Sequence, residues 1–428
     1  METPEINRVV ETIATAVGVG GLLLFGYVTG VDIWTLTLAP VFAPIAFFEG
    51  QVYLGLFSFV IAVSGLILAG DIWRSDDRQG ALTSGPPVRA IVPAYRDADV
   101  VNVSVESLVE NEYDPLGVTI VVEPGDEPTR KRAVELADRY DAVEWVVNER
   151  PGSKATAINY AVERSSEEYF VVFDADERAS SAFVAGAMAE LTEGTDVFQG
   201  RRIPRPSGAI ETIAYCERIV VQAGYLIGEL AGFTHCQSSA TGFTRDAFET
   251  VGGYADVLTE DIYFSHQCYQ AGLTVTRNRH YTSTMEPPHT LQDLWGQRKR
   301  WRIGHVQVSH LRTREAIGEN PAFSDLVAVG RAVGAVLGGG ALIVLSAHVL
   351  LLAALGVGTA FVPLAAIFGM VLGVWSKDFR DGRVGWPAWT VVLVPLVYLG
   401  HGLLTAKALF EYALTWDGEW YQVSKSGV

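Results

Sequence analysis

The sequence predicts an α/β domain with a mostly parallel sheet, flanked on both sides by membrane-spanning helices. Three observations lead to this prediction. The mean hydropathy of the 428 residues is +0.23, although 19% of them are charged. Charge-free runs stand near both ends of the chain, and the middle region alternates strand-like with helical segments. Apolar and charged residues are therefore segregated, as in a water-exposed domain attached to membrane helices.

Near the N-terminus, residues 14–31 and 50–70 contain no charged side chain. Each run is close to the roughly 20 residues that a helix needs to cross a bilayer. The uncharged residues 33–48 between them are fewer and include Pro40 and Pro44, so we expect an interfacial or external loop there. The leading segment is acidic and no small-residue cleavage site follows, so the first run does not read as a removable signal peptide.

Near the C-terminus, residues 332–376 are uncharged, which is long enough for two spans with a turn near residues 356–359. Residues 384–406 supply a candidate fifth span. The positive-inside rule places two basic clusters in the cytosol. The clusters follow the second and fourth spans and comprise Arg74, Arg78, Lys377, Arg380 and Arg383.

These features predict three regions. Residues 1–73 form a membrane region with two spans, and residues 74–321 form a cytosolic domain that includes an interfacial helix near residues 291–312. Residues 322–428 form a second membrane region with two to three spans and a short tail. We expect a multi-pass protein of the plasma membrane whose middle domain faces the cytoplasm.

The middle region supports the parallel sheet. Strand-like runs cover residues 88–95, 118–123, 143–147 and 169–173, and helical stretches cover residues 101–109, 129–139 and 153–163. Strands that alternate with helices predict a mostly parallel sheet, and ligands bind such sheets at the carboxyl ends of the strands. Functional side chains are therefore expected just after each strand.

The charge balance excludes some functions. The net charge is −17, so a nucleic-acid partner is not expected, because its phosphates would be repelled. The acidity also suits a halophilic source. The three cysteines are widely spaced and form neither a disulfide framework nor a zinc pattern, which fits a reducing, cytosol-facing domain.

Polar groups do follow the predicted strands. Tyr95 and Asp97 stand at the end of the first, Glu123 ends the second, and Asp174 and Asp176 follow the fourth. Two carboxylates at this spacing can bind one hard cation, Mg²⁺ or Mn²⁺, which usually also holds substrate phosphates. In so acidic a chain, the alternative is a solvated turn.

Two further motifs lie downstream. Glu260 and Asp261 follow Thr259, and a carboxylate there can act as a general base toward an acceptor hydroxyl; the alternative is a helix N-cap with its first turn. Gln297, Arg300 and Trp301 then share one helix face. The cations of this segment can neutralise a leaving diphosphate and the Trp can stack on a sugar ring, or the helix lies on anionic lipid.

In this order, Asp-x-Asp, Thr-Glu-Asp and Gln-x-x-Arg-Trp resemble the inverting family 2 glycosyltransferases, most closely the processive cellulose, chitin and hyaluronan synthases. The resemblance covers roughly residues 88–301 and the flanking spans. It implies a GT-A type catalytic domain, a nucleotide-sugar donor, a divalent metal and a polysaccharide acceptor.

The resemblance also implies roles for residues on the donor side. Tyr95 resembles the residue that packs on the nucleobase, and Asp97 lies in the same motif. Glu123 stands where the family has an Asp that reads uracil, and Lys154 resembles the lysine that holds the diphosphate. Asp174 and Asp176 would serve the nucleotide-sugar and its metal. Where the family has Asn-Glu and Asp-Asp, this chain has Arg96-Asp97 and Glu123-Pro124, which leaves the base open between uridine and guanosine.

On the acceptor side, the resemblance implies that Asp261 is the base, next to Glu260. Gln297, Arg300 and Trp301 would close the site around diphosphate and acceptor. Cys236 and Gly242 stand where the family shapes the acceptor pocket, and packing is the alternative role for both. The tail around Lys425 loosely resembles the family's gating loop. A full fifth span would place that tail outside, so either residues 384–406 are interfacial or re-entrant, or the gating interpretation is wrong.

Three functions remain open. The first is a polymerising transferase that passes its product through its own spans. The second is a non-processive enzyme that glycosylates a polyprenyl phosphate or another lipid, a class that often lacks Gln-x-x-Arg-Trp. The third is a non-catalytic transporter or scaffold, against which the retained acids argue.

Overall fold

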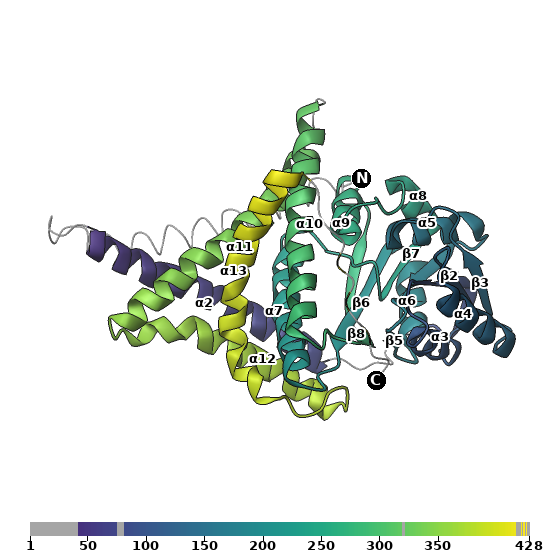
Figure 1. The fold of residues 1–428 in the computed structure, drawn as a ribbon, viewed down its shortest axis with the longest axis horizontal. Helices are drawn as coiled ribbons and strands as arrows, with labels where there is room; N and C mark the ends of the chain where they lie inside the picture. The colour runs from purple at the N-terminus through teal and green to yellow at the C-terminus, as the bar shows by residue number, and fades with distance from the viewer. Residues whose placement is uncertain are drawn as a thin grey trace. The chain divides into compact units, whose positions relative to one another are not determined.

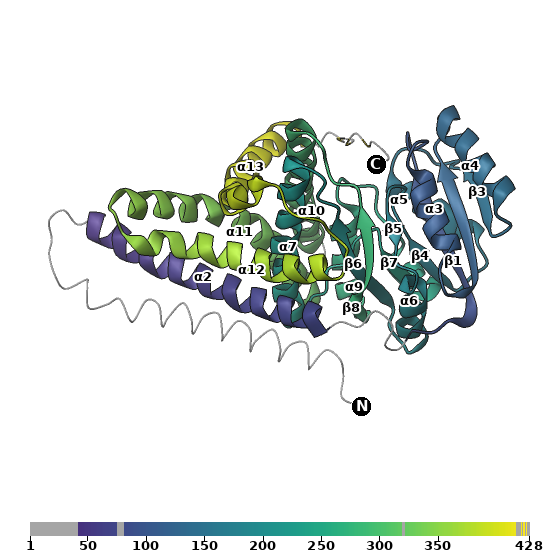
Figure 2. The ribbon, with the colours of Figure 1, turned by 90° about the horizontal axis from the view of Figure 1, so that it is seen from below.

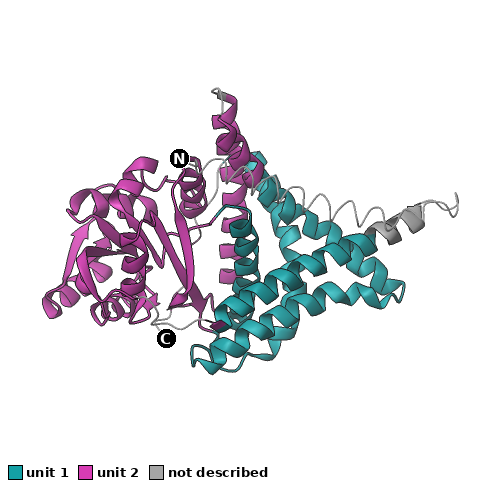
Figure 3. Cartoon of the chain, turned by 180° about the vertical axis from the view of Figure 1, so that it is seen from behind, with its two compact units in different colours: residues 1–73, 206–233, 333–416 teal, residues 74–205, 234–332, 417–428 magenta. Residues whose placement is uncertain are grey.

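The computed structural model describes residues 42–74, 81–318 and 322–416, together with Tyr421, Val423 and Lys425. The described chain falls into two compact units, which Figure 3 colours separately. Unit 1 comprises residues 1–73, 206–233 and 333–416, and unit 2 comprises residues 74–205, 234–332 and 417–428. The predicted first span, residues 14–31, lies outside the described residues, and the predicted domain limits stay a prediction.

Unit 2 is built on one eight-stranded sheet with the order β3-β2-β1-β4-β7-β6-β8-β5 (Figure 1). Strands β1 to β4 are parallel, β6 and β8 are parallel, and β7 is antiparallel to both of its neighbours. The prediction of a mostly parallel sheet is confirmed. The strands are β1 (Ser84–Ala94), β2 (Asp114–Val122), β3 (Val143–Val147), β4 (Tyr169–Val172), β5 (Arg178–Ala179), β6 (Val197–Pro204), β7 (Thr241–Thr244) and β8 (Val275–Met285).

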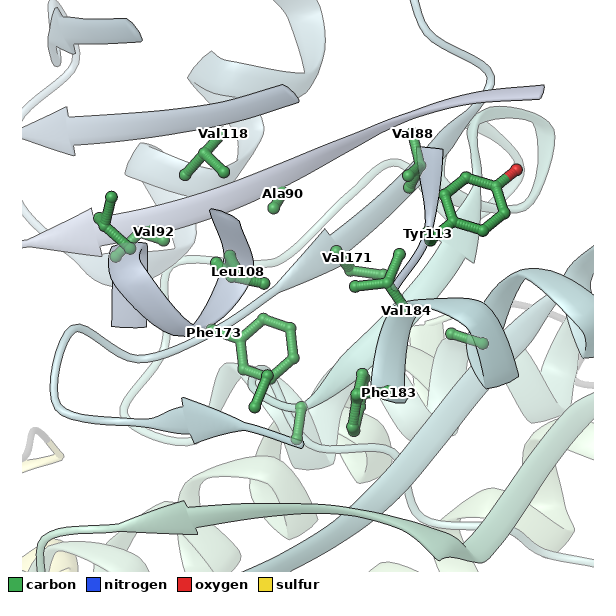
Figure 4. Packing of buried hydrophobic residues seen from close by; sticks show 14 of the residues in the cluster. Val88, Ala90, Val92, Leu108, Tyr113, Val118, Val171, Phe173, Phe183 and Val184 are labelled. Atoms are coloured by element: carbon green, nitrogen blue, oxygen red, sulfur yellow. The ribbon is translucent and has the colours of Figure 1, made fainter. Parts of the chain in front are cut away.

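The central strands are buried on both faces because successive side chains point to opposite sides of the sheet. On one face, Val88, Ala90 and Val92 of β1 join a core that includes Leu108 and Phe183 (Figure 4). On the other face, Ile91 belongs to a second core with Val121, Phe170 and Phe248. This double burial explains the near-continuous apolar runs in the sequence and fixes the strand ends as rigid supports.

The helices of unit 2 begin and end close to the predicted positions. The helix predicted over residues 101–109 is confirmed at both ends, and Ser153 caps the helix that begins at Lys154. Asp126 caps the helix before it by accepting from the backbone N–H of Thr129. The helices are α3 (Val101–Val109), α4 (Glu127–Arg139), α5 (Lys154–Arg164), α6 (Phe183–Thr192), α8 (Arg245–Val251), α9 (Glu260–Gln270) and α10 (Leu291–Gly318).

Unit 1 is helical in its described part. It contains α7 (Ala209–Leu230), α12 (Val362–Arg380), α13 (Val394–Thr415) and most of α2 (Phe42–Arg74) and of α11 (Phe323–Ala354), with short 3₁₀ turns at Gly358–Phe361 and Trp389–Leu393. The loop predicted over residues 33–48 is wrong from Phe42 onward, because α2 begins there. Pro44 falls within its first turn, where a missing N–H costs no helical hydrogen bond.

Four helical segments in the described residues are long and apolar enough to cross a bilayer: Gly50–Arg74, Phe323–Ala354, Gly358–Arg380 and Trp389–Thr415. The turn predicted near residues 356–359 is present. In Figure 1, α2 and α11 slope in opposite senses, α13 is steeper than both, and α13 packs against α12 and α7 (Figure 2).

Candidate active site

The register of the parallel strands brings the predicted donor residues to one edge of the sheet. Ala94 of β1 lies opposite Val122 of β2, and Ile91 lies opposite Val172 of β4. The residues that follow these strands therefore lie at neighbouring carboxyl ends, where ligands bind such sheets. They are Tyr95, Asp97, Glu123, Asp174 and Asp176.

Asp174 is bound by two cations. Its Oδ1 accepts from the ammonium of Lys154, the first residue of α5, and its Oδ2 lies 2.5 Å from Nη2 of Arg202 on β6. The backbone N–H of Asp174 donates to Ser239 Oγ at 2.8 Å. Burial alone would raise the pKa of Asp174, but Lys154 and Arg202 hold it well below its ordinary value. This carboxylate is therefore ionised at any physiological pH.

Arg202 also binds a carboxylate that the sequence analysis did not select. Its Nε donates to Glu177 Oε1 at 2.9 Å, and the hydroxyls of Ser239 and Ser283 donate to the same fully buried carboxylate. The sequence alone shows only two arginines in this segment, and the structure adds that all eight residues of the strand are buried. A buried arginine requires an acidic partner, and Glu177 follows the Asp-x-Asp directly.

Asp176 and Asp97 share the ammonium of Lys425. Lys425 Nζ lies 2.9 Å from Asp176 Oδ1 and 2.9 Å from Asp97 Oδ1, and the backbone N–H of Glu286 donates to Asp176 Oδ2. Burial would lower the pKa of Lys425, but Asp176 and Asp97 raise it overall. For Asp97 the balance is reversed, because burial raises its pKa despite Lys425. The tail of the chain thus reaches the acid pair.

The two acids of the Asp-x-Asp motif differ in how they could bind a divalent metal. Both oxygens of Asp174 accept from side-chain cations, whereas Asp176 offers one oxygen to an ammonium that it shares with Asp97. The ammonium of Lys425 shows that a cation can be bound between these carboxylate oxygens. Carboxylate oxygens are the hard donors that suit Mg²⁺ or Mn²⁺. Across the described ranges, no cluster of three or more His, Cys, Asp or Glu side chains forms a metal site. Asp176 fits a cation whose other ligands are water and substrate phosphate.

The turn after β1 is held in an unusual conformation. Arg96 has a φ of 57°, which non-glycine residues rarely adopt, and its backbone N–H donates to Asp126 Oδ2 at 2.5 Å. The Tyr95 ring is 42% exposed and has the Arg96 guanidinium 5.0 Å from its centre. An exposed ring on a fixed turn suits stacking by a nucleobase. The Arg96 that replaces the family's Asn contributes to this face of the site.

Glu123 is tied to the loop before α5. Its Oε1 accepts from Asn148 Nδ2 at 2.7 Å, and its Oε2 accepts from the backbone N–H of Gly152 at 3.3 Å. Asn148 is fully buried, directly follows β3, and was not selected from the sequence. Glu123 therefore connects the second strand to the segment that positions Lys154.

The predicted base lies at the start of α9. Thr259 is the N-cap residue, so the helix-start interpretation of Thr-Glu-Asp is correct, and it places Glu260 and Asp261 in the first turn. Glu260 Oε1 accepts from Ser238 Oγ at 2.6 Å. Burial, and then the charge of Glu260, raise the pKa of Asp261 to about 6. A general base is most effective when its pKa lies near the operating pH.

Two cations act on both acids. Lys154 binds Asp174 directly and also lowers the pKa of Asp261, and the charge of Arg300 on α10 acts on Asp174 and Asp261 alike. The donor acid and the predicted base are therefore placed around the same positive charges. This arrangement lies within unit 2.

The other residues of the Gln-x-x-Arg-Trp motif are also on α10. The Arg298 guanidinium lies 4.4 Å from the centre of the Trp301 ring, and Arg298 donates to the side-chain oxygen of Gln297. Near the start of the same helix, Tyr421 of the tail donates to Asp293 Oδ1 at 3.0 Å. The tail is thus held at two points, by Asp293 and by the acids that bind Lys425.

Cys236 and Gly242 occupy packed positions. Cys236 is fully buried, and its backbone N–H donates to Ser265 Oγ at 3.0 Å. Gly242 lies inside β7, where a Cβ would come within 3.2 Å of Leu191 and 3.3 Å of the carbonyl oxygen of Phe170. The acceptor role of both residues stays a prediction, and the packing alternative accounts for their contacts.

Comparison with known families identifies part of the chain. Residues 90–252 match the family model described as "Glycosyl transferase family 2". Relatives include "Poly-beta-1,6-N-acetyl-D-glucosamine synthase" of Staphylococcus aureus (strain MSSA476), which is 24% identical over 287 residues, or 64% of this chain and 65% of the relative. The synthase of the same name from Staphylococcus epidermidis is 25% identical over 226 residues, or 51% of this chain and 54% of the relative. The chain thus spans less than two thirds of these curated relatives.

Among solved structures, a similar fold occurs in the mannosyltransferase PcManGT from Pyrobaculum calidifontis, which was solved in complex with GDP-Man and Mn²⁺. The TM-score is 0.53 at 19% sequence identity, and the match covers 85% of this chain and 99% of that one. At this identity the likeness concerns the fold, and it confirms the GT-A type arrangement that the sequence predicted.

Proposed function

The chain carries a glycosyltransferase family 2 domain over residues 90–252, and from this premise we propose that it extends a polysaccharide by moving a sugar from a nucleotide-diphosphate donor with inversion. The observation that carries the proposal is the shared pair of cations. Lys154 and Arg300 act on both Asp174 and Asp261, so a leaving diphosphate and an acceptor hydroxyl would meet beside the same charges. The synthases that resemble the chain polymerise N-acetylglucosamine by name, which makes UDP-N-acetylglucosamine the first donor to test.

The residues support a single displacement. Asp261 takes the proton of the acceptor hydroxyl, whose oxygen attacks the anomeric carbon and forms the new bond. The bond from that carbon to the diphosphate oxygen breaks on the opposite side, so the configuration inverts. Lys154 and Arg300 stabilise the charge that develops on the diphosphate. Tyr95 stacks on the base of the nucleotide, and Gln297 and Trp301 contribute the acceptor side.

A divalent metal, Mg²⁺ or Mn²⁺, would be held by Asp176, with Asp174 beside it. When bound, such an ion neutralises charge on substrate phosphates. Asp174 already carries two protein cations, so its part in this proposal is to fix Lys154 and Arg202 rather than to supply a free oxygen.

The membrane arrangement follows from unit 1. We propose that the charge-free helices anchor the enzyme in the plasma membrane and that the catalytic domain faces the cytoplasm, since Lys377 and Arg380 stand in the last turn of α12. An interfacial α13 keeps the tail on the catalytic side, because a helix in the membrane plane does not carry the chain across. The contacts of Lys425 with Asp97 and Asp176 support this arrangement, because they place the tail at the catalytic acids.

Product sizing tests the proposal. Membranes that contain the full chain are supplied with labelled UDP-N-acetylglucosamine, with an Asp261→Asn preparation as the matched control. We expect a ladder of long polymers that the control lacks. A single organic-extractable glycolipid would instead support the non-processive alternative, and no incorporation from any UDP- or GDP-sugar would contradict transferase activity on this donor class.

A further inference from the structure

A buried histidine stands beside the proposed base. His235 lies in the segment between α7 and β7, is 6% exposed, and has Nε2 3.9 Å from Asp261 Oδ2. Its other ring nitrogen, Nδ1, lies 3.1 Å from Ser265 Oγ, one turn after Asp261 on α9. His235 directly precedes Cys236 in the predicted acceptor segment, but no role was predicted for its side chain, so its position next to the base needs a separate explanation.

The hydroxyl of Ser265 determines which ring nitrogen carries the proton. Ser265 Oγ accepts from the backbone N–H of Cys236 at 3.0 Å and lies within hydrogen-bond distance of two carbonyl oxygens, those of Asp261 at 2.7 Å and Cys236 at 3.0 Å. Carbonyl oxygens only accept, so the single hydroxyl proton is directed to them. His235 Nδ1–H then donates to Ser265 Oγ. In the neutral ring Nε2, which faces Asp261, therefore carries the lone pair.

We infer that His235 is a positioning residue for the proposed base: as the pH falls it takes up a proton at Nε2, and the resulting imidazolium keeps Asp261 ionised. The inference rests on the proposed function, because it assigns a partner to the base of that reaction. An opposite charge within about 4–6 Å favours the ionised form of a carboxylate. At 3.9 Å the imidazolium is close enough to act in this way without a direct hydrogen bond.

The other charged groups around Asp261 explain why a histidine partner would matter. Burial and Glu260 both disfavour the ionised form of Asp261, and Lys154 and Arg300 oppose them from α5 and α10. The diphosphate of a bound donor would neutralise part of the positive charge of Lys154 and Arg300. These two cations would then stabilise the ionised form of Asp261 less. His235 lies on the other side, from the segment before β7, and is independent of the donor. The titratable and charged groups around the pair are Glu260, Lys154, Arg300, Arg277, the phenol of Tyr254 and the thiols of Cys236 and Cys268.

The test compares pH profiles of kcat/KM for the full chain in membranes, with UDP-N-acetylglucosamine as donor. His235→Asn keeps a polar group near the position of Nδ1 and can still bind Ser265, but it cannot take up a proton. His235→Gln serves as a second variant, and His280→Asn on β8 is the matched control. We expect the acidic limb of both His235 variants to move up by about one pH unit. We expect kcat at pH 8.5 to stay within about threefold of the wild type and the donor KM to be unchanged, because Asp261 is ionised there in every variant.

The outcomes separate the two proposals. A uniform loss of kcat at every pH, with the limb unmoved, would mean that His235 only holds the segment in place, and the inference would be overturned. The same conclusion follows if the His280 control moves the limb as far as the His235 variants do. If the wild type and the Asp261→Asn variant are both active, Asp261 is not the base. His235 would then have no base to position.

Discussion

The two acids at the centre of the site, Asp174 and Asp261, have the same side chain in opposite environments. Asp174 is bound by Lys154 and Arg202, and its pKa is far below the ordinary value. Asp261 is only partly exposed and lies beside the buried carboxylate of Glu260, and its pKa is raised to about 6. A carboxylate fixed by cations organises charge but cannot take a proton, whereas one that is poorly stabilised as an anion can. The difference separates the donor side of the site from the acceptor side.

The largest expected effect tests the acceptor side of this comparison. Asp261→Asn should reduce kcat by about 10³-fold, because the amide cannot accept a proton from the acceptor hydroxyl. Donor binding, measured by tryptophan fluorescence or calorimetry, should stay within about threefold, since the donor contacts lie with Lys154 and Asp176. Asp256→Asn is the control, because Asp256 is exposed and stands four residues before Glu260. This variant should retain full activity. Turnover by Asp261→Asn near the wild-type rate would remove the base assignment.

The next effect tests the donor side. Asp176→Asn should weaken Mn²⁺ binding by at least about tenfold, as followed by electron paramagnetic resonance of the free ion, because it removes an anionic oxygen ligand. Excess EDTA should likewise abolish transfer by the wild type, and added Mn²⁺ should restore it. Asp126→Asn is not a suitable control, since Asp126 supports the turn at Arg96; Asp138→Asn on α4 is used instead. Full activity in EDTA would refute the metal proposal.

Asp174 and Asp261 also illustrate how much of the site can be predicted from the sequence. The strand ends place Tyr95, Glu123 and Asp174 correctly, because a sheet buried on both faces leaves a clear apolar pattern and fixes where each strand ends. The order of three motifs then identifies the family, although each motif alone is compatible with an ordinary turn or helix start.

The remainder depends on contacts between distant positions. Arg202 binds Asp174 from 28 positions away, and Lys425 reaches Asp97 across 328 positions. Pairs of residues so far apart in the chain leave no local periodic pattern in the sequence from which they could be predicted. The sequence also leaves two options for α13, because its apolar composition is equally compatible with crossing the bilayer and with lying in its interface. The burial of Arg202 within β6, which the structure adds, points to its acidic partner.

A smaller effect is expected in the pH dependence of kcat/KM, to which Asp174 and Asp261 should contribute differently. The proposed base acts only when ionised, so kcat/KM of the wild type should fall about tenfold per pH unit below about pH 6 and level off above it. Asp174 contributes no limb in this range, because its pKa lies far lower. The profile is measured under saturating Mn²⁺ with a buffer series of constant ionic strength. A flat profile between pH 5 and pH 8 would contradict the raised pKa of Asp261.

The smallest expected effect concerns the tail. Lys425→Ala removes the ammonium that Asp176 and Asp97 share, so without donor the site loses a cation that competes with a metal for Asp176 Oδ1. We expect Mn²⁺ to bind about threefold more tightly to this variant, a small change because the lysine must also be stripped of water to occupy the site. Lys131→Ala on the exposed face of α4 removes the same charge elsewhere and controls for the change in net charge. Equal Mn²⁺ affinity in the Lys425 variant, the control and the wild type would mean that the tail does not contact Asp176 in solution. The donor side would then owe its positive charge to Lys154 and Arg202 alone, and the contrast with Asp261 would rest on residues of the sheet and its first helices rather than on the end of the chain.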